Sequence, residues 1–190
     1  MDIIEAIKQR HSVRKYAGKP VEINDVLEIL NIARESPSSG NLQNWRFVIV
    51  TDEKKRKKIA DACLQQAWME EAPVHIVVCN DPTEVVANYE DAGRKYAIQN
   101  CAIVSQNIML AALKFKLGSC YVGAFDNSAI REILNIPEHI EVEAIITLGY
   151  PAEEAREKKY GLEILTSINE FGKIDINKPK IKELIKKFSG

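Results

Sequence analysis

The chain has 190 residues, of which 46% are hydrophobic and 28% are charged, and these proportions are typical of a folded globular domain rather than a disordered chain. Its 26 basic and 27 acidic residues give a net charge of -1, which argues against a nucleic-acid-binding protein, because such proteins need a basic surface. The four cysteines form no CxxC pair and lie among apolar neighbours, so we expect buried free thiols and a cytoplasmic location. No segment resembles a signal peptide or a membrane span, so we expect no membrane association.

The predicted elements alternate between helices and strands. The first half of the sequence predicts a helix capped by Asp2, a helix capped by Asn24, a strand at 45–51, a helix from Asp52 to about residue 66, and a strand at 74–79. The second half predicts a helix that starts at 81–84 with Asp81 as its cap, a long helix at 89–115, a strand at 119–122, a helix from Asp126 to about residue 134, and a strand at 142–148. The middle of the long helix, 97–113, is apolar on nearly every side, which indicates burial under the sheet or at a subunit interface.

A basic cluster follows the first predicted helix. It consists of Arg10, His11, Ser12 and Arg14. Guanidinium groups bind phosphate bidentately and the serine hydroxyl adds a donor, so the cluster predicts a phosphate-binding site. The alternative is a solvated basic face that favours a helix C-terminus. Lys158 and Lys159, after the last predicted strand, could reach the same phosphate, or they could belong to a solvated loop.

Two further segments suit the binding of a flat heterocycle. The first is the polar stretch before the strand at 45–51, with Pro37, Ser38, Ser39, Asn41 and Gln43. Its hydroxyls and carboxamides can bond to the edges of a ring, although the same residue types also suit an ordinary turn. The second is the stretch of small residues at 118–126, with Gly123 and Ala124, where the backbone could approach a ligand closely. An ordinary strand-to-helix turn is the alternative.

Other catalytic patterns are missing from the sequence. It contains no GxSxG, HExxH, GxGxxG or GxxxxGK[ST] pattern, and no spaced group of metal ligands. His75 lies in an apolar stretch and His139 in a turn, and neither has a spaced partner, which favours structural roles. We therefore expect neither a metal site nor a catalytic acid or base.

Four segments together resemble the FMN-dependent nitroreductase family. They are RHSVRKY at 10–16, SPSSGNLQNWRFVIV at 36–50, AALKFKLGSCYVGAFD at 111–126 and ITLGYPAEE at 146–154. The resemblance covers roughly residues 2–166 and implies an α+β fold, with a central mixed, mainly antiparallel sheet flanked by helices. It also implies an intertwined homodimer with two FMN sites, each built from both chains. We expect a flavin-binding domain at 1–166 and a C-terminal extension at 167–190 that packs on the partner subunit.

The resemblance also assigns roles to individual residues. It implies that Arg10, Ser12 and Arg14 bind the phosphate and ribityl chain, with His11 between them. The residues implied to lie near the flavin are Pro37, Ser38, Ser39, Asn41 and Gln43, and the backbone at Gly123 and Ala124 is implied to pass the ring. Lys159, or failing it Lys158, is implied to reach the phosphate. One departure stands out, because Asn44 occupies a position where the family often has proline. We expect this change to alter the loop near the ring.

The implied activity is that of an FMN-dependent oxidoreductase. Electrons pass from NAD(P)H through the bound flavin to a nitroaromatic, quinone or similar small aromatic acceptor by ping-pong kinetics, and the chemistry is mediated by the flavin. The alternative is a flavin-binding protein of the same fold, with a different flavin chemistry or no nicotinamide-driven turnover. We expect the dimer to form through the 97–113 helix, with Ile98, Ile108, Met109 and Leu113 on its exposed face.

Overall fold

The computed structural model describes residues 2–153 and 159–173, which belong to two compact units, 1–155 and 156–190. The helices of the larger unit are α1 (Ile3–Gln9), α2 (Ile23–Ala33), α3 (Glu53–Ala62), α4 (Thr83–Tyr89), α5 (Asp91–Ala112) and α6 (Asn127–Leu134), with 3-10 turns η1 (Ser39–Asn41), η2 (Ala67–Glu71) and η3 (Leu113–Phe115). Its strands are β1 (Trp45–Val50), β2 (Val74–Asn80), β3 (Gly118–Val122) and β4 (Glu141–Gly149). The smaller unit contains α7 (Leu162–Leu165). The division at residue 166 expected from the sequence stays a prediction.

A four-stranded sheet forms the centre of the larger unit. Its strand order is β1-β2-β4-β3, and every neighbouring pair is antiparallel. A single parallel bridge joins Ser12 to Ser119 beside β3. That bridge adds no strand to the four, so the sheet itself is antiparallel throughout rather than mixed, and the predicted α+β class is confirmed.

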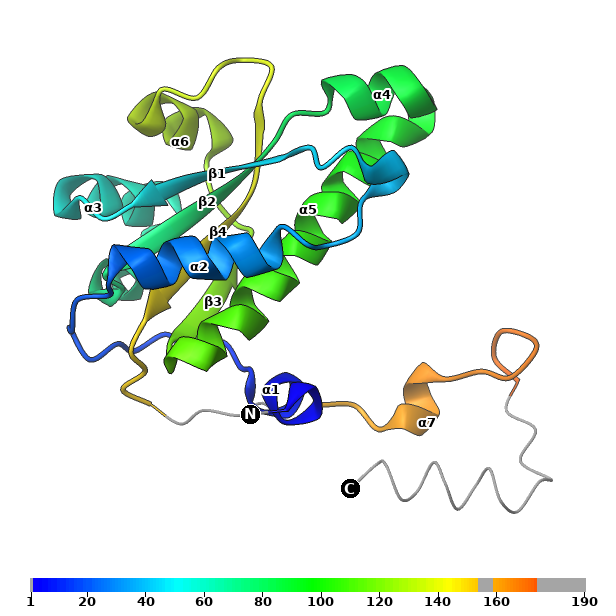
Figure 1. Cartoon of the computed structure of the whole chain (residues 1–190), viewed down its shortest axis with the longest axis horizontal. Coiled ribbons are helices and arrows are strands. Elements are labelled where there is room, and N and C mark those ends of the chain that lie inside the picture. The colour runs from blue at the N-terminus through cyan, green and yellow to red at the C-terminus, as the bar shows by residue number, and fades with distance from the viewer. Residues whose placement is uncertain (1, 154–158, 174–190) are drawn as a thin grey trace. The chain divides into compact units, whose positions relative to one another are not determined.

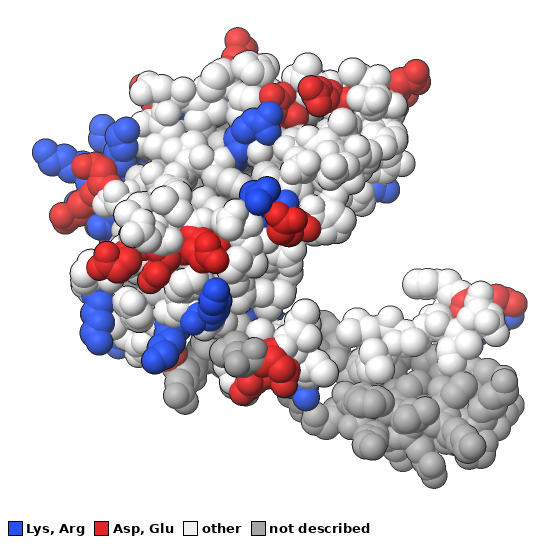
Figure 2. Space-filling view, viewed as in Figure 1, with Lys and Arg blue, Asp and Glu red and all other residues white. Residues whose placement is uncertain are grey.

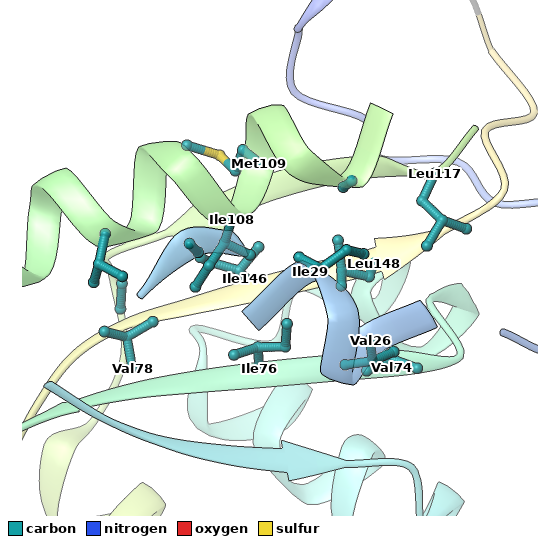
Figure 3. Close-up of a cluster of buried hydrophobic side chains, with 14 of the residues drawn as sticks. Val26, Ile29, Val74, Ile76, Val78, Ile108, Met109, Leu117, Ile146 and Leu148 are labelled. Atoms are coloured by element: carbon teal, nitrogen blue, oxygen red, sulfur yellow. The ribbon is translucent and has the colours of Figure 1, made fainter. Parts of the chain in front are cut away.

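Two helical layers cover the sheet, one on each face (Figure 1). One face packs against α2 and α5, through side chains such as Ile29, Ile108 and Ile146 (Figure 3). The other face packs against α3, η2 and α6, through side chains such as Met69 and Ile130. All five of these side chains are fully buried, and each contributes about 1.5–3 kcal/mol of transfer free energy relative to an exposed position.

Three of the predicted helix caps are confirmed. The carboxylates of Asp2, Asp52 and Asp126 accept hydrogen bonds from backbone N–H groups three residues later, at 2.8, 2.8 and 3.0 Å. The prediction for Asn24 is wrong, because α2 begins at Ile23 and Asn24 lies inside the helix. Each confirmed cap satisfies one of the free N–H groups of a first turn.

Two other predicted boundaries differ from the structure because of the local backbone. The helix from Asp52 ends at Ala62 rather than near residue 66, since Leu64 and Gln65 both have left-handed backbone with φ of 57°. The α4 helix begins at Thr83, one residue later than expected, and Pro82 rather than Asp81 is its cap.

The faces of α5 differ from the sequence prediction. The helix is not buried all round, because Ile98 is 52% exposed and Ile103 is 40% exposed. Ile108 and Met109, expected on an exposed face, lie instead in the core against the sheet, and Leu113 is half-buried. Helical spacing explains the correction, since Ile108 is four residues after Val104 and therefore lies on the same, sheet-facing side.

Other sequence-level predictions concern cysteines, histidines and membranes. All four cysteines are free and buried, as predicted. His75 is fully buried in β2, and its Nε2 pairs with the Met69 carbonyl at 2.9 Å, which agrees with a structural role. Among the residues that the structure describes, no helix combines the length and apolar character that a bilayer crossing needs.

Candidate functional site

The segment after α1 is attached to the edge of β3 by its backbone. The Val13 N–H donates to the Ser119 carbonyl at 3.0 Å, beside the parallel bridge between Ser12 and Ser119. Val13 itself is buried, and a Cβ added at Gly118 would lie only 2.7 Å from its Cγ2 atom. Glycine at 118 therefore allows the segment to lie directly against the strand.

Tyr16 holds the other end of this segment. Its hydroxyl donates to the Val13 carbonyl at 2.8 Å and lies 2.7 Å from Thr147 Oγ1 on β4. Burial raises the pKa of Tyr16 above its ordinary value, while the hydrogen bond with Thr147 opposes the rise. A neutral hydroxyl is thus kept in the core as a structural donor.

The basic cluster lies beside Cys120 of β3, because Ser12 forms a bridge to the preceding residue, Ser119. Burial raises the pKa of the Cys120 thiol, and the charge of Arg14, the side chain of Ser12 and the charge of Arg10 each oppose that rise. The Arg14 side chain is exposed, while its backbone N–H donates to Glu153 Oε1 at 2.6 Å.

His11 completes the cluster with an unpaired nitrogen. Its Nδ1 lies 2.9 Å from the Gln9 carbonyl, whereas its Nε2 is buried and has no hydrogen-bond partner within the described part of the chain. In the same part of the chain, neither Arg10 nor Arg14 forms an ion pair. The two guanidinium groups and the Ser12 hydroxyl form a donor set suited to a phosphate. His11 Nδ1 donates to the Gln9 carbonyl, so Nε2 of a neutral ring is an acceptor.

The 37–43 loop contains the other predicted polar residues. Pro37, Asn41 and Gln43 are exposed, whereas Ser38 and Ser39 are half-buried. Backbone φ values of 56° at Gly40, 59° at Asn41 and 44° at Gln43 turn the loop tightly. The Gln43 carboxamide donates to the Asn41 backbone carbonyl at 3.2 Å and to Asn41 Oδ1 at 3.4 Å, so both carboxamides lie together at the exposed tip.

Buried asparagines hold this loop to the rest of the unit. The N–H and hydroxyl of Ser39 both donate to Asn100 Oδ1 on α5, at 3.0 and 3.1 Å. The Asn100 amide donates to Asn44 Oδ1 at 2.7 Å, and the Asn44 amide donates to Asn80 Oδ1 at 2.6 Å. Sequence reasoning noticed Asn44 only as a departure from the family pattern and missed Asn80 and Asn100, because no local signal connects them.

The segment after β3 lies beside an unusual turn. Gly123 and Ala124 are both exposed, as close approach of a ligand would require. The nearby Asp126 N–H donates to the Ala62 carbonyl at 2.8 Å, which joins this segment to the end of α3. Directly after that end come Leu64 and Gln65 in left-handed conformation, which is strained for residues other than glycine. Sequence reasoning missed this turn because neither residue type favours it.

The basic cluster and the 37–43 loop lie at opposite ends of α5 (Figure 1). The loop is bound to Asn100 near the start of the helix, while the cluster lies on β3, which follows the end of the helix. Between Asn100 and Ala112 alone the helix rises roughly 18 Å, at 1.5 Å per residue. One chain therefore brings the cluster to the start of β3, but not to the loop.

Two predicted lysines and one unexpected basic run remain. Lys158 lies outside the described residues, and Lys159 is exposed in the 156–190 unit, so their part in the site stays a prediction. On the face in Figure 2, acidic and basic side chains are interspersed, and basic ones gather over α3, which contains the run 54–58. Within that run, Arg56 donates to the carbonyls of Glu70 and Ala72 at 2.7 and 2.6 Å, which joins α3 to η2.

The comparisons with known proteins agree with this architecture. The family model described as "Nitroreductase family" matches residues 7–69 and 64–150. A Methanothermobacter thermautotrophicus protein, provisionally named NADH dehydrogenase/NAD(P)H nitroreductase, is 36% identical over 158 residues, which cover 80% of this chain and 79% of the relative. The NADPH-flavin oxidoreductase of Vibrio harveyi is 31% identical, with 82% of this chain and 68% of the relative covered. A solved structure of an FMN-dependent nitroreductase from Clostridium difficile superimposes with a TM-score of 0.77 and 27% identity, covering 89% of this chain and all of the other. The chain thus belongs to the nitroreductase family.

Proposed function

We propose that the protein is an FMN-dependent oxidoreductase that takes its electrons from NAD(P)H. The observation that carries the proposal is the short segment with Arg10, Ser12 and Arg14, which the Val13–Ser119 hydrogen bond and the Ser12–Ser119 bridge hold against β3. Membership of the nitroreductase family supports FMN as the ligand whose phosphate binds here, since relatives are named as NADPH-flavin oxidoreductase and FMN-dependent nitroreductase.

The residues of the site have separate tasks in this proposal. The basic cluster holds the phosphate and ribityl chain, with Lys159 or Lys158 as a further cation, while Gly123 and Ala124 pass along the ring. When bound, FMN supplies the two-electron chemistry, accepting a hydride from the nicotinamide and reducing the acceptor. The protein binds and orients the reactants, and no protein acid or base is needed for the hydride itself.

The acceptor is a small, flat aromatic such as a nitroaromatic or a quinone. The exposed carboxamides of Asn41 and Gln43 offer hydrogen bonds without charge, so selection rests on stacking and edge contacts. Donor and acceptor use one pocket in turn, which gives ping-pong kinetics and parallel double-reciprocal lines. Intersecting lines would instead indicate a ternary complex.

A homodimer completes the site. The cluster and the 37–43 loop are far apart in one chain, so a second copy supplies the loop to each cluster. A groove of about 650 Å³ between α1, α2 and α5, lined by Ile3, Ile32 and Leu110 among others, suits such a copy. The whole of α1 lacks buried residues, and Ile3 is 72% exposed, as expected of an interface helix seen without its partner. The 167–190 extension also packs on the partner in this proposal, and the enzyme is cytoplasmic.

The absorption spectrum of the purified protein tests the proposal. We expect a bound-flavin band in the visible range, released FMN on denaturation, and loss of the band when NADH or NADPH is added without oxygen. A folded protein that does not bind FMN would contradict the proposal. A flavin band that survives both nicotinamides would favour the second candidate, a flavin protein of this fold without nicotinamide-driven turnover.

A further inference from the structure

A continuous set of side-chain hydrogen bonds crosses the unit from the 37–43 loop to β4. The asparagine network consists of Ser39, Asn100, Asn44, Asn80 and Glu143, taken in order of contact. Its last bond joins the Asn80 amide to Glu143 Oε1 at 2.7 Å. The three asparagines are 2–3% exposed, while Glu143 at the end is half-buried. Buried amides at this depth are stabilising only when each polar group has a partner.

A β-bulge directs Glu143 into the network. Val78 of β2 pairs with Ala144 of β4, but the next residue, Cys79, pairs with Val142. Glu143 is therefore an extra residue without a partner on β2. Bulges of this kind re-aim a side chain and are frequent beside functional sites. Glu143 also contributes to the raised pKa of Tyr121 on β3, behind the larger effect of burial.

The two ends of the network fix its direction. An ionised carboxylate only accepts hydrogen bonds, so Asn80 must turn its NH₂ group to Glu143 and its oxygen to Asn44. The Ser39 N–H only donates, so Asn100 must turn its oxygen to the loop. Asn44 is consistent with both requirements, because its amide donates to Asn80 and also to the Ala97 carbonyl at 3.1 Å. Every amide therefore donates toward Glu143.

We propose that Glu143 is a positioning residue which, through the three asparagines, holds the 37–43 loop in its flavin-binding conformation. The inference rests on the proposed function, in which this loop meets the ring end of the flavin. Glu143 touches neither loop nor ligand, and its effect passes through Asn80, Asn44 and Asn100. The network is separate from the basic cluster, so it affects the affinity for the ring and not for the phosphate.

Hydrogen exchange of the Ser39 amide tests the anchoring without any flavin. In the flavin-free protein, Asn100→Leu and Glu143→Leu are expected to speed exchange at Ser39 by roughly five- to thirty-fold, the equilibrium effect of losing one or two partners. Glu143→Gln keeps an acceptor for Asn80 and should restore most of the protection. Ser105→Ala is the matched control, since Ser105 is as deeply buried on α5 but bonds only to the Cys101 carbonyl of its own helix.

Flavin affinity tests the functional half of the inference. Asn100→Leu and Glu143→Leu should weaken FMN and riboflavin by the same factor, roughly five- to thirty-fold, so that the FMN/riboflavin ratio stays at its wild-type value. A merely structural role would leave both affinities unchanged in folded protein, as expected for Ser105→Ala. Unchanged Ser39 exchange or unchanged riboflavin affinity in Glu143→Leu would overturn the proposal. A wild-type protein that binds no flavin would instead contradict the proposed function itself, which separates the two failures.

Discussion

The two halves of the proposed ligand site lie at the two ends of α5 and are held in different ways. At one end, the basic cluster is attached by backbone groups, through the bond from Val13 to Ser119 and the Tyr16 hydroxyl. At the other end, the 37–43 loop is attached by buried side chains, through Asn100 and Asn44. The first arrangement leaves the charged side chains free for a ligand. The second uses side chains for the fold itself.

This difference predicts how each half responds to substitution. Changing a side chain of the basic cluster should affect ligand affinity with little effect on stability, because the backbone bonds remain. Changing a member of the asparagine network should lower stability and ligand affinity together, because its polar partners stay buried without hydrogen bonds.

The largest effect is expected from removing both guanidinium groups of the basic cluster. The double substitution Arg10→Ala/Arg14→Ala should lower FMN affinity by about a hundred- to ten-thousand-fold, since each charge-assisted pair contributes about 1.5–3 kcal/mol. Calorimetric titration should show a riboflavin affinity close to wild type, and thermal unfolding should show a Tm close to wild type. Arg34→Ala, which removes a surface arginine paired with Glu35, is the control and should change neither. A parallel loss of riboflavin affinity would place the phosphate elsewhere.

A smaller effect, on stability, is expected at the loop end. Asn44→Leu leaves Asn80 Oδ1 and the Asn100 amide without a partner, while the Ala97 carbonyl keeps its helical hydrogen bond. We expect the free energy of unfolding to fall by about 2 kcal/mol, at about 1 kcal/mol for each group. Denaturant titration measures the loss. A loss no larger than that of Ser105→Ala would show that the network contributes little to the fold.

The third effect vanishes at neutral pH and concerns His75, which lies at the cluster end of the sheet opposite Thr147. Burial lowers the pKa of His75 from 6.5 to about 4, and the hydrogen bond to the Met69 carbonyl only partly opposes this. In the unfolded chain the imidazole takes up a proton near pH 6.5, so the native state loses stability as the pH falls from there to about 4, by about 3 kcal/mol in all. His75→Phe should remove that loss, whereas His139→Gln, at an exposed site, should keep it. An unchanged slope in His75→Phe would mean that another group causes the acid sensitivity.

The sequence predicted the cluster end of the molecule better than the loop end. Charged residues at 10–14 and capping residues such as Asp52 and Asp126 act within a few positions, so their pattern is visible along the chain. The asparagine network joins residues 39, 44, 80, 100 and 143, whose proximity depends on the completed sheet and on a bulge in β4. Long-range hydrogen bonds of this kind have no local periodicity.

The buried faces of α5 show the same limit. Ile98 and Ile108 are equally apolar in the sequence, yet one is half exposed and the other fully buried. Apolar composition gives the length of such a helix, but only the packing against α2 and the sheet decides which face is covered. The sequence therefore could not separate an interface position from a core position.

Complementation between two defective chains tests the central claim, that each flavin site combines the cluster of one chain with the loop of its partner. One chain is Arg10→Ala/Arg14→Ala. The other is Gly40→Val, which places a β-branched residue at a position with a φ of 56° and its Cβ only 2.9 Å from the Tyr89 hydroxyl, so the loop conformation is disfavoured. Each homodimer should bind FMN poorly. A heterodimer isolated through two different affinity tags should bind one FMN per dimer with near wild-type affinity, because one of its sites has an intact cluster and an intact loop. A heterodimer that binds FMN as poorly as both homodimers would contradict the claim.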